Sequence, residues 1–119
     1  MIHLFALNCA STCKNWEDPN CYKIIWEEFL TDARSGKIDK FRKHLHDELG
    51  ADFDQYVEKV GDTKTKSIIA NTYNADFDVI HENKDIDLIE ISVQRTKMDS
   101  ITFQTFVFKK IKNKWLLVD

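Results

Sequence analysis

A small set of aspartate, tyrosine and histidine residues provides the side chains suited to acid–base chemistry. These candidates are Asp54, Tyr56, Tyr73, Asp78 and His81. A general base needs a partner that orients it within hydrogen-bond reach, and no spacing among these residues singles out such a pair. Tyr56 is better explained as an apolar position of a helix, and His81 as one residue on the face of a strand. Acid–base catalysis is therefore kept as an alternative to the main prediction.

The spacing of potential metal ligands does not indicate a metal centre. The three cysteines are separated by three and by seven residues, which matches no common zinc-ligand spacing. His44 and Glu48 stand one helical turn apart, but two ligands alone do not form a site. The aspartate pairs at 76/78 and 85/87 lack the glycine turn and the distal glutamate of a calcium-binding loop. We predict no metal and no other cofactor.

The composition is that of one ordinary globular domain. Of 119 residues, 43% are hydrophobic and 12% are aromatic, which is enough for a single core. The net charge of −3, with acidic and basic residues interspersed, argues against nucleic acid as a partner. The lysines at 109, 110, 112 and 114 are interpreted as protecting an exposed hairpin edge from pairing with other chains. No apolar run approaches the roughly 20 residues that span a bilayer.

The first ten residues, MIHLFALNCA, are almost entirely apolar. This segment resembles the end of a bacterial lipoprotein signal, in which a cysteine that follows the cleavage site becomes acylated. By that resemblance Cys9 is the acylation site, and residues 1–18 form an N-terminal segment outside the domain, which spans 19–119. Asn8 stands where glycine or alanine is usual, and the basic opening of such a signal is missing unless the chain starts upstream of Met1.

The cysteines also bear on the cellular compartment. If Cys9 is acylated, Cys13 and Cys21 remain as a pair, and closing their loop by a disulfide would contribute about 2–3 kcal/mol. A disulfide requires an oxidising compartment, so this interpretation predicts the cell envelope, as a periplasmic or outer-surface lipoprotein. The alternative is a cytoplasmic protein with three thiols. Both interpretations stay open.

The elements that position these side chains begin with a long helix. Asp18 and Pro19 are typical of a helix opening, because aspartate caps the first turn and proline suits its first position. Apolar residues then recur at helical spacing until Gly36. The sequence therefore predicts a helix over 19–35.

Two further helices and one ambiguous stretch follow. Apolar spacing predicts a helix over 39–49 that ends at Gly50, and another over 53–60 that opens with a capping box at Asp52. The stretch 63–74 suits either a helix or a strand. Its threonines and isoleucines favour a strand.

The second half of the chain has the pattern of a sheet. Residues 75–82 form one predicted strand, and residues 86–118 contain three β-rich runs separated by two turns. Residues 89–93 alternate between aliphatic and polar side chains, as in a strand with one buried face. Residues 102–108 are apolar on both faces, which places them inside the sheet. The last third is therefore predicted to be an antiparallel meander.

This arrangement resembles the cystatin-like roll, also called the nuclear transport factor 2-like fold. The resemblance rests on WEEFL at 26–30, SGKIDKF at 35–41 and FKKIKNKWLLVD at 108–119, and it covers roughly residues 19–119. It implies an α+β fold in which N-terminal helices pack on a curved antiparallel sheet and leave a cone-shaped pocket. Members of this fold use that pocket for different purposes, so the resemblance does not identify an activity.

The main functional prediction is a small, non-enzymatic, envelope-associated binding or accessory protein. Its partner would be a protein or a hydrophobic small molecule held by the sheet face or the pocket, with five aromatic residues supplying apolar contact. These residues are Trp26, Phe103, Phe106, Phe108 and Trp115. One alternative is a pocket enzyme of the isomerase or dehydratase type. The other is a cytoplasmic interaction protein that forms a homodimer through its sheet.

Overall fold

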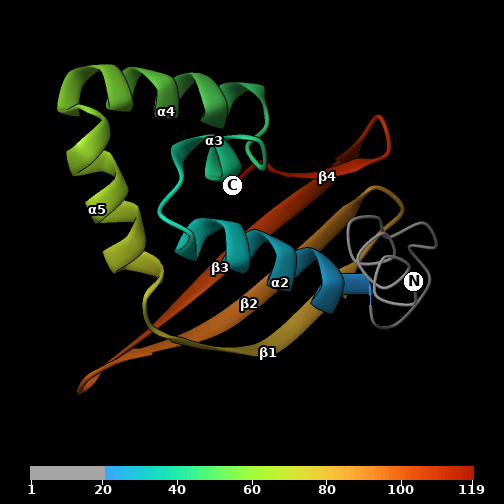
Figure 1. The fold of residues 1–119 in the computed structure, drawn as a ribbon. Helices are drawn as coiled ribbons and strands as arrows, with labels where there is room; N and C mark the ends of the chain where they lie inside the picture. The colour runs from blue at the N-terminus through green and yellow to red at the C-terminus, as the bar shows by residue number, and fades with distance from the viewer. Residues whose placement is uncertain (1–20) are drawn as a thin grey trace, which may run out of the picture.

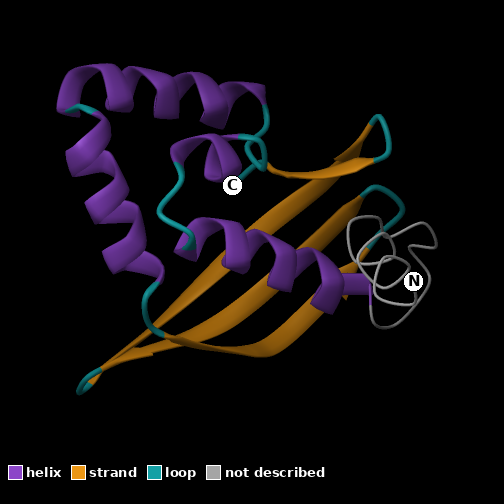
Figure 2. Cartoon of the chain, in the orientation of Figure 1, coloured by secondary structure: helices purple, strands orange, loops and turns teal. Residues whose placement is uncertain are grey.

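The computed structural model describes residues 21–119, which form four helices followed by one four-stranded sheet (Figures 1 and 2). The helices are α2 (Cys21–Arg34), α3 (Ile38–Arg42), α4 (Asp47–Val60) and α5 (Asp62–Tyr73). The strands are β1 (Asp76–Lys84), β2 (Leu88–Lys97), β3 (Ser100–Ile111) and β4 (Lys114–Leu117). The sheet is an antiparallel meander in the order β1-β2-β3-β4, and α2 lies across its curved face. The predicted α+β class is confirmed.

The register of β2 and β3 explains how the meander builds the core. Ile89 pairs with Phe108 and Ile91 pairs with Phe106, so four large apolar side chains point toward α2 and are buried. The alternation of strand side chains sends Phe103 to the opposite face, where it is exposed. The predicted position of residues 102–108 inside the sheet is therefore confirmed, with Phe106 and Phe108 in the core and Phe103 in solvent.

Phe29 of α2 occupies the centre of the core. Its ring centroid lies between 5.5 and 5.9 Å from those of five aromatic side chains, which are Trp26, Phe41, Tyr73, Phe106 and Phe108. These tilted and edge-to-face contacts add to the burial of apolar surface. The space beneath the middle of α2 is thus filled by side chains.

The helix predicted over 39–49 is wrong in its extent. α3 ends at Arg42, and α4 begins at Asp47 and runs through Gly50. Between them the backbone N–H of Leu117 donates to the carbonyl of His44 (2.7 Å), and the N–H of His46 donates to the carbonyl of Leu117 (2.9 Å). Pairing with β4 takes these backbone groups out of the helix. A local apolar pattern contains no information on this distant contact.

The strand favoured over 63–74 is also wrong, because these residues form α5. Two threonines that favoured the strand satisfy their hydroxyl groups within the helix. Thr65 Oγ1 donates to the carbonyl of Gly61 (2.7 Å), and Thr72 Oγ1 donates to the carbonyl of Ile68 (2.8 Å). A threonine hydroxyl bonded to the carbonyl four residues earlier is compatible with a helix.

The carbonyls at the end of α5 receive hydrogen bonds from two basic side chains of β2. Arg95 Nε donates to the carbonyl of Thr72 (3.1 Å), and Lys97 Nζ donates to the carbonyl of Asn71 (2.7 Å). The last carbonyls of a helix lack partners within the helix, and cations interact favourably with that end. These contacts fix α5 on the sheet. None of the described helices is long and apolar enough to cross a membrane.

Candidate functional site

An open groove of about 540 Å³ lies between α2 and the first half of β1. Its apolar lining comes from Tyr22, Trp26 and Leu30 of α2 and from Phe77 and Val79 of β1. Trp26 meets the edge of Phe77 with ring centroids 5.7 Å apart, which closes the bottom of the groove toward the core. The resemblance implied a pocket in the cone. The groove lies beside α2, and the space beneath the middle of that helix is filled by aromatic side chains.

A row of polar side chains on α2 forms the outer wall of the groove. Lys23, Glu27, Thr31 and Arg34 all line it, and their spacing of four, four and three residues places them on one helix face. Arg34 has a defined position, because its Nε donates to the carbonyl of Tyr73 (2.9 Å) and its Nη2 donates to the carbonyl of Ala75 (2.6 Å). The groove therefore combines an apolar floor with a cation near each end of its helical wall.

Arg34 also contacts the floor of the groove. Its guanidinium carbon lies 5.9 Å from the ring centroid of Phe77, within the range of a cation–π interaction. Phe77 faces the groove because it pairs with Arg95, and Val79 does so because it pairs with Val93, both on the inner face of the sheet. The register shifts after Val79, where Ile80 is an extra residue. The regularly paired part of β1 beside the groove is therefore short.

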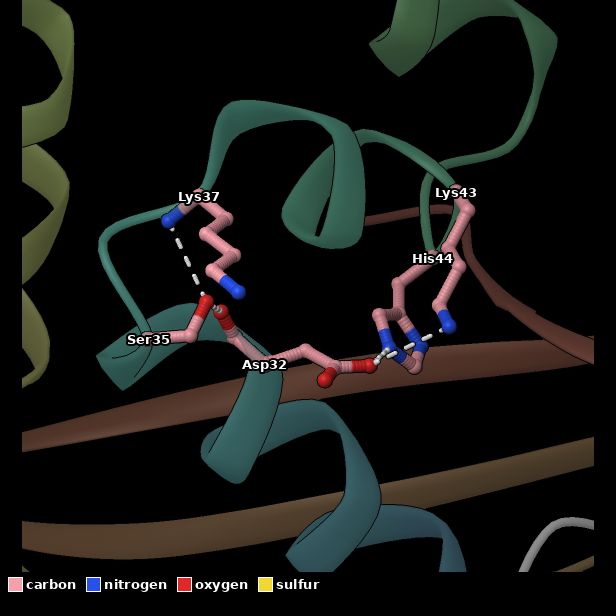
Figure 3. Close-up of polar contacts among 5 residues, drawn as sticks. All are labelled: Asp32, Ser35, Lys37, Lys43 and His44. Atoms are coloured by element: carbon pink, nitrogen blue, oxygen red, sulfur yellow. Dashed lines mark hydrogen bonds and ion pairs between the residues drawn. The ribbon is translucent and has the colours of Figure 1, made fainter.

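A second polar cluster joins α2 to the segment that follows α3 (Figure 3). Asp32 Oδ2 lies 2.6 Å from Nε2 of His44 and 3.6 Å from Nζ of Lys43. An ionised carboxylate can only accept hydrogen bonds, so Nε2 of His44 carries the proton in this contact. His44 is buried and meets Phe29 edge to face at 5.7 Å. Ser35 Oγ donates to the carbonyl of Asp32 (2.7 Å), which closes the end of α2.

This second cluster is a tether between elements. His44 is held by its backbone to β4 and by its side chain to α2. Burial raises the pKa of the neighbouring Glu28, Asp32 raises it further, and the charges of His44 and Lys43 oppose this shift. None of these four side chains lines the groove described above. A histidine–carboxylate pair is therefore present, but it faces a different part of α2.

The five aromatic residues predicted to form one surface do not do so. Trp26, Phe106 and Phe108 belong to the core. Trp115 packs against that core, and its Nε1 is buried without a hydrogen-bond partner in the described part of the chain. Phe103 alone is largely exposed, at 66% of its surface, on the outer face of the sheet. The sequence showed that β3 is apolar on both faces, but the alternation of the strand separates Phe103 from Phe106 and Phe108.

The acid–base candidates are likewise not brought together. Asp54 is exposed and accepts two hydrogen bonds from Arg42, at 2.9 and 3.1 Å, which lower the pKa of that carboxyl. Tyr73 is packed among aromatic rings, and burial raises its pKa to about 12. Tyr56 on α4 and the β1 residues Asp78 and His81 are exposed. The geometry gives no support to these residues as one catalytic site.

The predicted ligand and cysteine positions have different outcomes. His44 lies before α4 and pairs with Asp32, so the helical pairing with Glu48 considered for a metal is wrong. Within residues 21–119 no group of three or more potential ligands gathers around a common point. Cys21 is fully buried at the start of α2. Cys9 and Cys13 lie outside the described residues, so the acylation site and the cysteine pair stay predictions.

Sequence reasoning did not find the groove, although one signal for it was present. Lys23, Glu27, Thr31 and Arg34 form a polar stripe next to the buried stripe of the first helix. That pattern alone suits any solvated helix face. Only the position of β1, whose first residues follow the Ala75 carbonyl that Arg34 holds, makes this stripe one wall of a cavity.

Comparison with solved structures supports the architecture. The chain matches a designed nuclear transport factor 2-like protein with a TM-score of 0.56, over 85% of this chain and 95% of that chain. The two sequences are 16% identical, so the likeness shows the fold alone. No protein-family model and no functionally curated protein matches this sequence.

Proposed function

We propose that this nuclear transport factor 2-like domain is a small, non-enzymatic binding protein of the cell envelope, and that its ligand is an amphipathic anion held between α2 and β1. The observation that carries the proposal is the groove itself. Its volume of about 540 Å³ falls within the range of ligand pockets, and its floor is apolar. Lys23 and Arg34 on the wall favour a negatively charged group on the ligand.

The position of the histidine–carboxylate pair supports binding over catalysis. His44 and Asp32 are the hydrogen-bonded acid–base pair of the described chain, and neither lines the groove. Both are instead used to hold α2 against the segment that joins β4. A ligand in the groove would therefore meet an apolar surface and charged side chains, and the carboxylate of Glu27 there has no orienting hydrogen bond within residues 21–119.

Binding of anilinonaphthalene sulfonate, an amphipathic anion whose fluorescence rises in apolar surroundings, tests this proposal. Thr31→Trp places a large ring in the groove from an exposed position, and the affinity for the probe should fall about tenfold or more. Thr63→Trp is the matched control, because Thr63 is exposed on α5 and does not line the groove. Equal affinities of the two variants would contradict the proposal.

The envelope location rests on the N-terminal sequence. The apolar segment before Cys9 and the count of three cysteines support it. Intact mass measurement of the protein from a membrane fraction should show acyl chains that are lost in Cys9→Ser. Thiol titration under denaturing conditions should find Cys13 and Cys21 unreactive. An unmodified species with three reactive thiols would instead support the cytoplasmic alternative.

A second candidate function is homodimer formation through the outer face of the sheet. Phe103 and Ile101 are exposed by 66% and 57%, and they lie on that face opposite Gln94 and Thr96 of β2. Exposed apolar side chains on one sheet face favour contact with another protein surface. Phe103→Glu should convert a dimer into a monomer in analytical ultracentrifugation, whereas Thr102→Glu, on the other face, should not. A wild-type monomer at high concentration would exclude this candidate.

A further inference from the structure

We propose that the groove receives an extended peptide segment of a partner protein, which adds as a strand to the edge of β1 that is free within residues 21–119. This inference rests on the proposed function, because it names the kind of ligand that the groove holds. The alternate side chains of the added segment would enter the groove. Its backbone would pair with β1 and extend the sheet.

The first support is the position of β1 in the sheet. β1 is the first strand of the order β1-β2-β3-β4, and within residues 21–119 only β2 pairs with it. An edge strand presents a row of unpaired backbone N–H and C=O groups, which can bind another extended chain. The groove lies along this edge, with Phe77 and Val79 facing into it. Backbone pairing and side-chain burial are therefore available to the same segment.

The second support is the match in length. Lys23 and Arg34 mark the two ends of the helical wall and lie about 16 Å apart along the helix axis. That distance is spanned by about five residues of strand. On the opposite wall, the regular pairing of β1 runs from Asp76 to Val79 and then shifts at Ile80. Both walls thus limit the segment to about the same short length.

The third support is the charge pattern along the helical wall. Lys23 lies at one end, Arg34 at the other and Glu27 between them. Nη1 of Arg34 makes no hydrogen bond within residues 21–119, so it can donate to a ligand carboxylate. This pattern fits a segment with acidic residues at its ends and uncharged residues between them. Apolar side chains at alternate positions of that segment would contact Trp26, Phe77 and Val79.

A synthetic peptide tests this mode of binding on the full chain. The probe is acetylated and amidated Asp-Thr-Val-Thr-Val-Thr-Asp, in which the aspartates and valines share one face of the strand, and its binding is followed by the amide NMR signals of β1 and by hydrogen exchange. Two control peptides carry N-methyl groups either on the valines or on the threonines. A strand added at one edge uses the N–H groups of alternate residues only. One control should therefore lose binding at least tenfold, while the other keeps it.

The protein variants sharpen the test. Lys23→Glu should weaken binding of this peptide and strengthen binding of the same peptide with lysine at both ends. Thr31→Trp should weaken both, because it fills the groove. Thr63→Trp should change neither. Amides of β1 that face the free edge should exchange more slowly with the peptide bound, and those of β4 should not change.

The outcomes separate this inference from the function on which it rests. If anilinonaphthalene sulfonate binds in the groove but both N-methylated peptides bind like the parent, the groove is a binding site and strand addition is wrong. If neither the dye nor the peptide binds, the proposed function fails as well. Slow exchange of the β1 edge without peptide also overturns the inference. If that slow exchange depends on protein concentration, the edge is covered by a second copy of the chain. If it does not, the edge is covered by the chain itself.

Discussion

The sheet and the helices that follow α2 are held by different kinds of contact. Strands that are adjacent in the sheet are also adjacent in the sequence, and their inner faces pack aliphatic and aromatic side chains against α2. α3, α4 and α5 also place Phe41, Phe53 and Ile69 in or against that core, but polar groups from distant parts of the chain fix their ends. Arg34 and Arg95 hold the end of α5, and the backbone of Leu117 holds the segment before α4. The apolar contacts of the sheet can be predicted from local sequence patterns, whereas the polar contacts with distant residues cannot.

Loss of an aromatic side chain from the inner face of the sheet should have the largest effect. Phe108 is fully buried and its ring lies 5.5 Å from that of Phe29. Phe108→Ala should lower the free energy of unfolding by about 3–5 kcal/mol, because it removes buried apolar surface and leaves a cavity. Phe103→Ala, on the exposed face of the same strand, should change it by about 0.5 kcal/mol. Urea denaturation measures both values, and similar losses would contradict this assignment of the two faces.

Removal of a polar attachment should act locally. Arg95→Met keeps the apolar stem but removes the donor to the carbonyl of Thr72, and the free energy of unfolding should fall by about 1–2 kcal/mol. Amide hydrogen exchange should become faster in α5 and stay slow in the buried strands. Gln94→Met, at the next position of β2 on the other face, is the control. Uniformly faster exchange across the molecule would show that α5 and the sheet open together.

A glycine within α4 tests a close contact between helices. An added Cβ at Gly50 would collide with the guanidinium of Arg42. In an exposed helix, glycine to alanine stabilises by about 1 kcal/mol, but at Gly50 this gain should be offset, because the added Cβ must push the flexible Arg42 side chain away from its pairing with Asp54. In an Arg42→Ala background the same change should become stabilising. Thermal denaturation of the four variants in this cycle measures the coupling, and additive effects would contradict the contact.

These contacts explain which parts of the structure the sequence could predict. Alternation at 89–93 and the apolar run at 102–108 were sufficient for the meander, because each strand pairs with its neighbour in the chain. The break at 43–46 depends on β4, some seventy residues later in the sequence, so the spacing of Leu45 and Leu49 was misleading.

The candidate site was even less accessible to sequence reasoning. Its walls come from α2 and β1, which lie about forty residues apart in the sequence. Of the aromatic residues predicted to form a contact surface, Trp26, Phe106 and Phe108 are buried in the core instead, whereas Phe103 is exposed. A groove depends on where two walls stand relative to each other. No single stretch of residues contains that information.

Loss of the exposed ion pair between α3 and α4 should have the smallest effect on stability. The direction in which this effect changes with pH can be tested. The hydrogen bonds from Arg42 lower the pKa of Asp54 below its ordinary value of 3.8. A lowered pKa in the folded state means that the pair stabilises the protein above the ordinary pKa and that this contribution is lost as the pH falls through the lowered one. Asp54→Asn should therefore reduce the urea midpoint slightly at neutral pH, and the two proteins should converge in acid. Added salt should also shrink the difference, because both groups are exposed. A difference that grows on acidification would show that Asp54 stabilises the fold in its protonated form, in conflict with the observed pairing to Arg42.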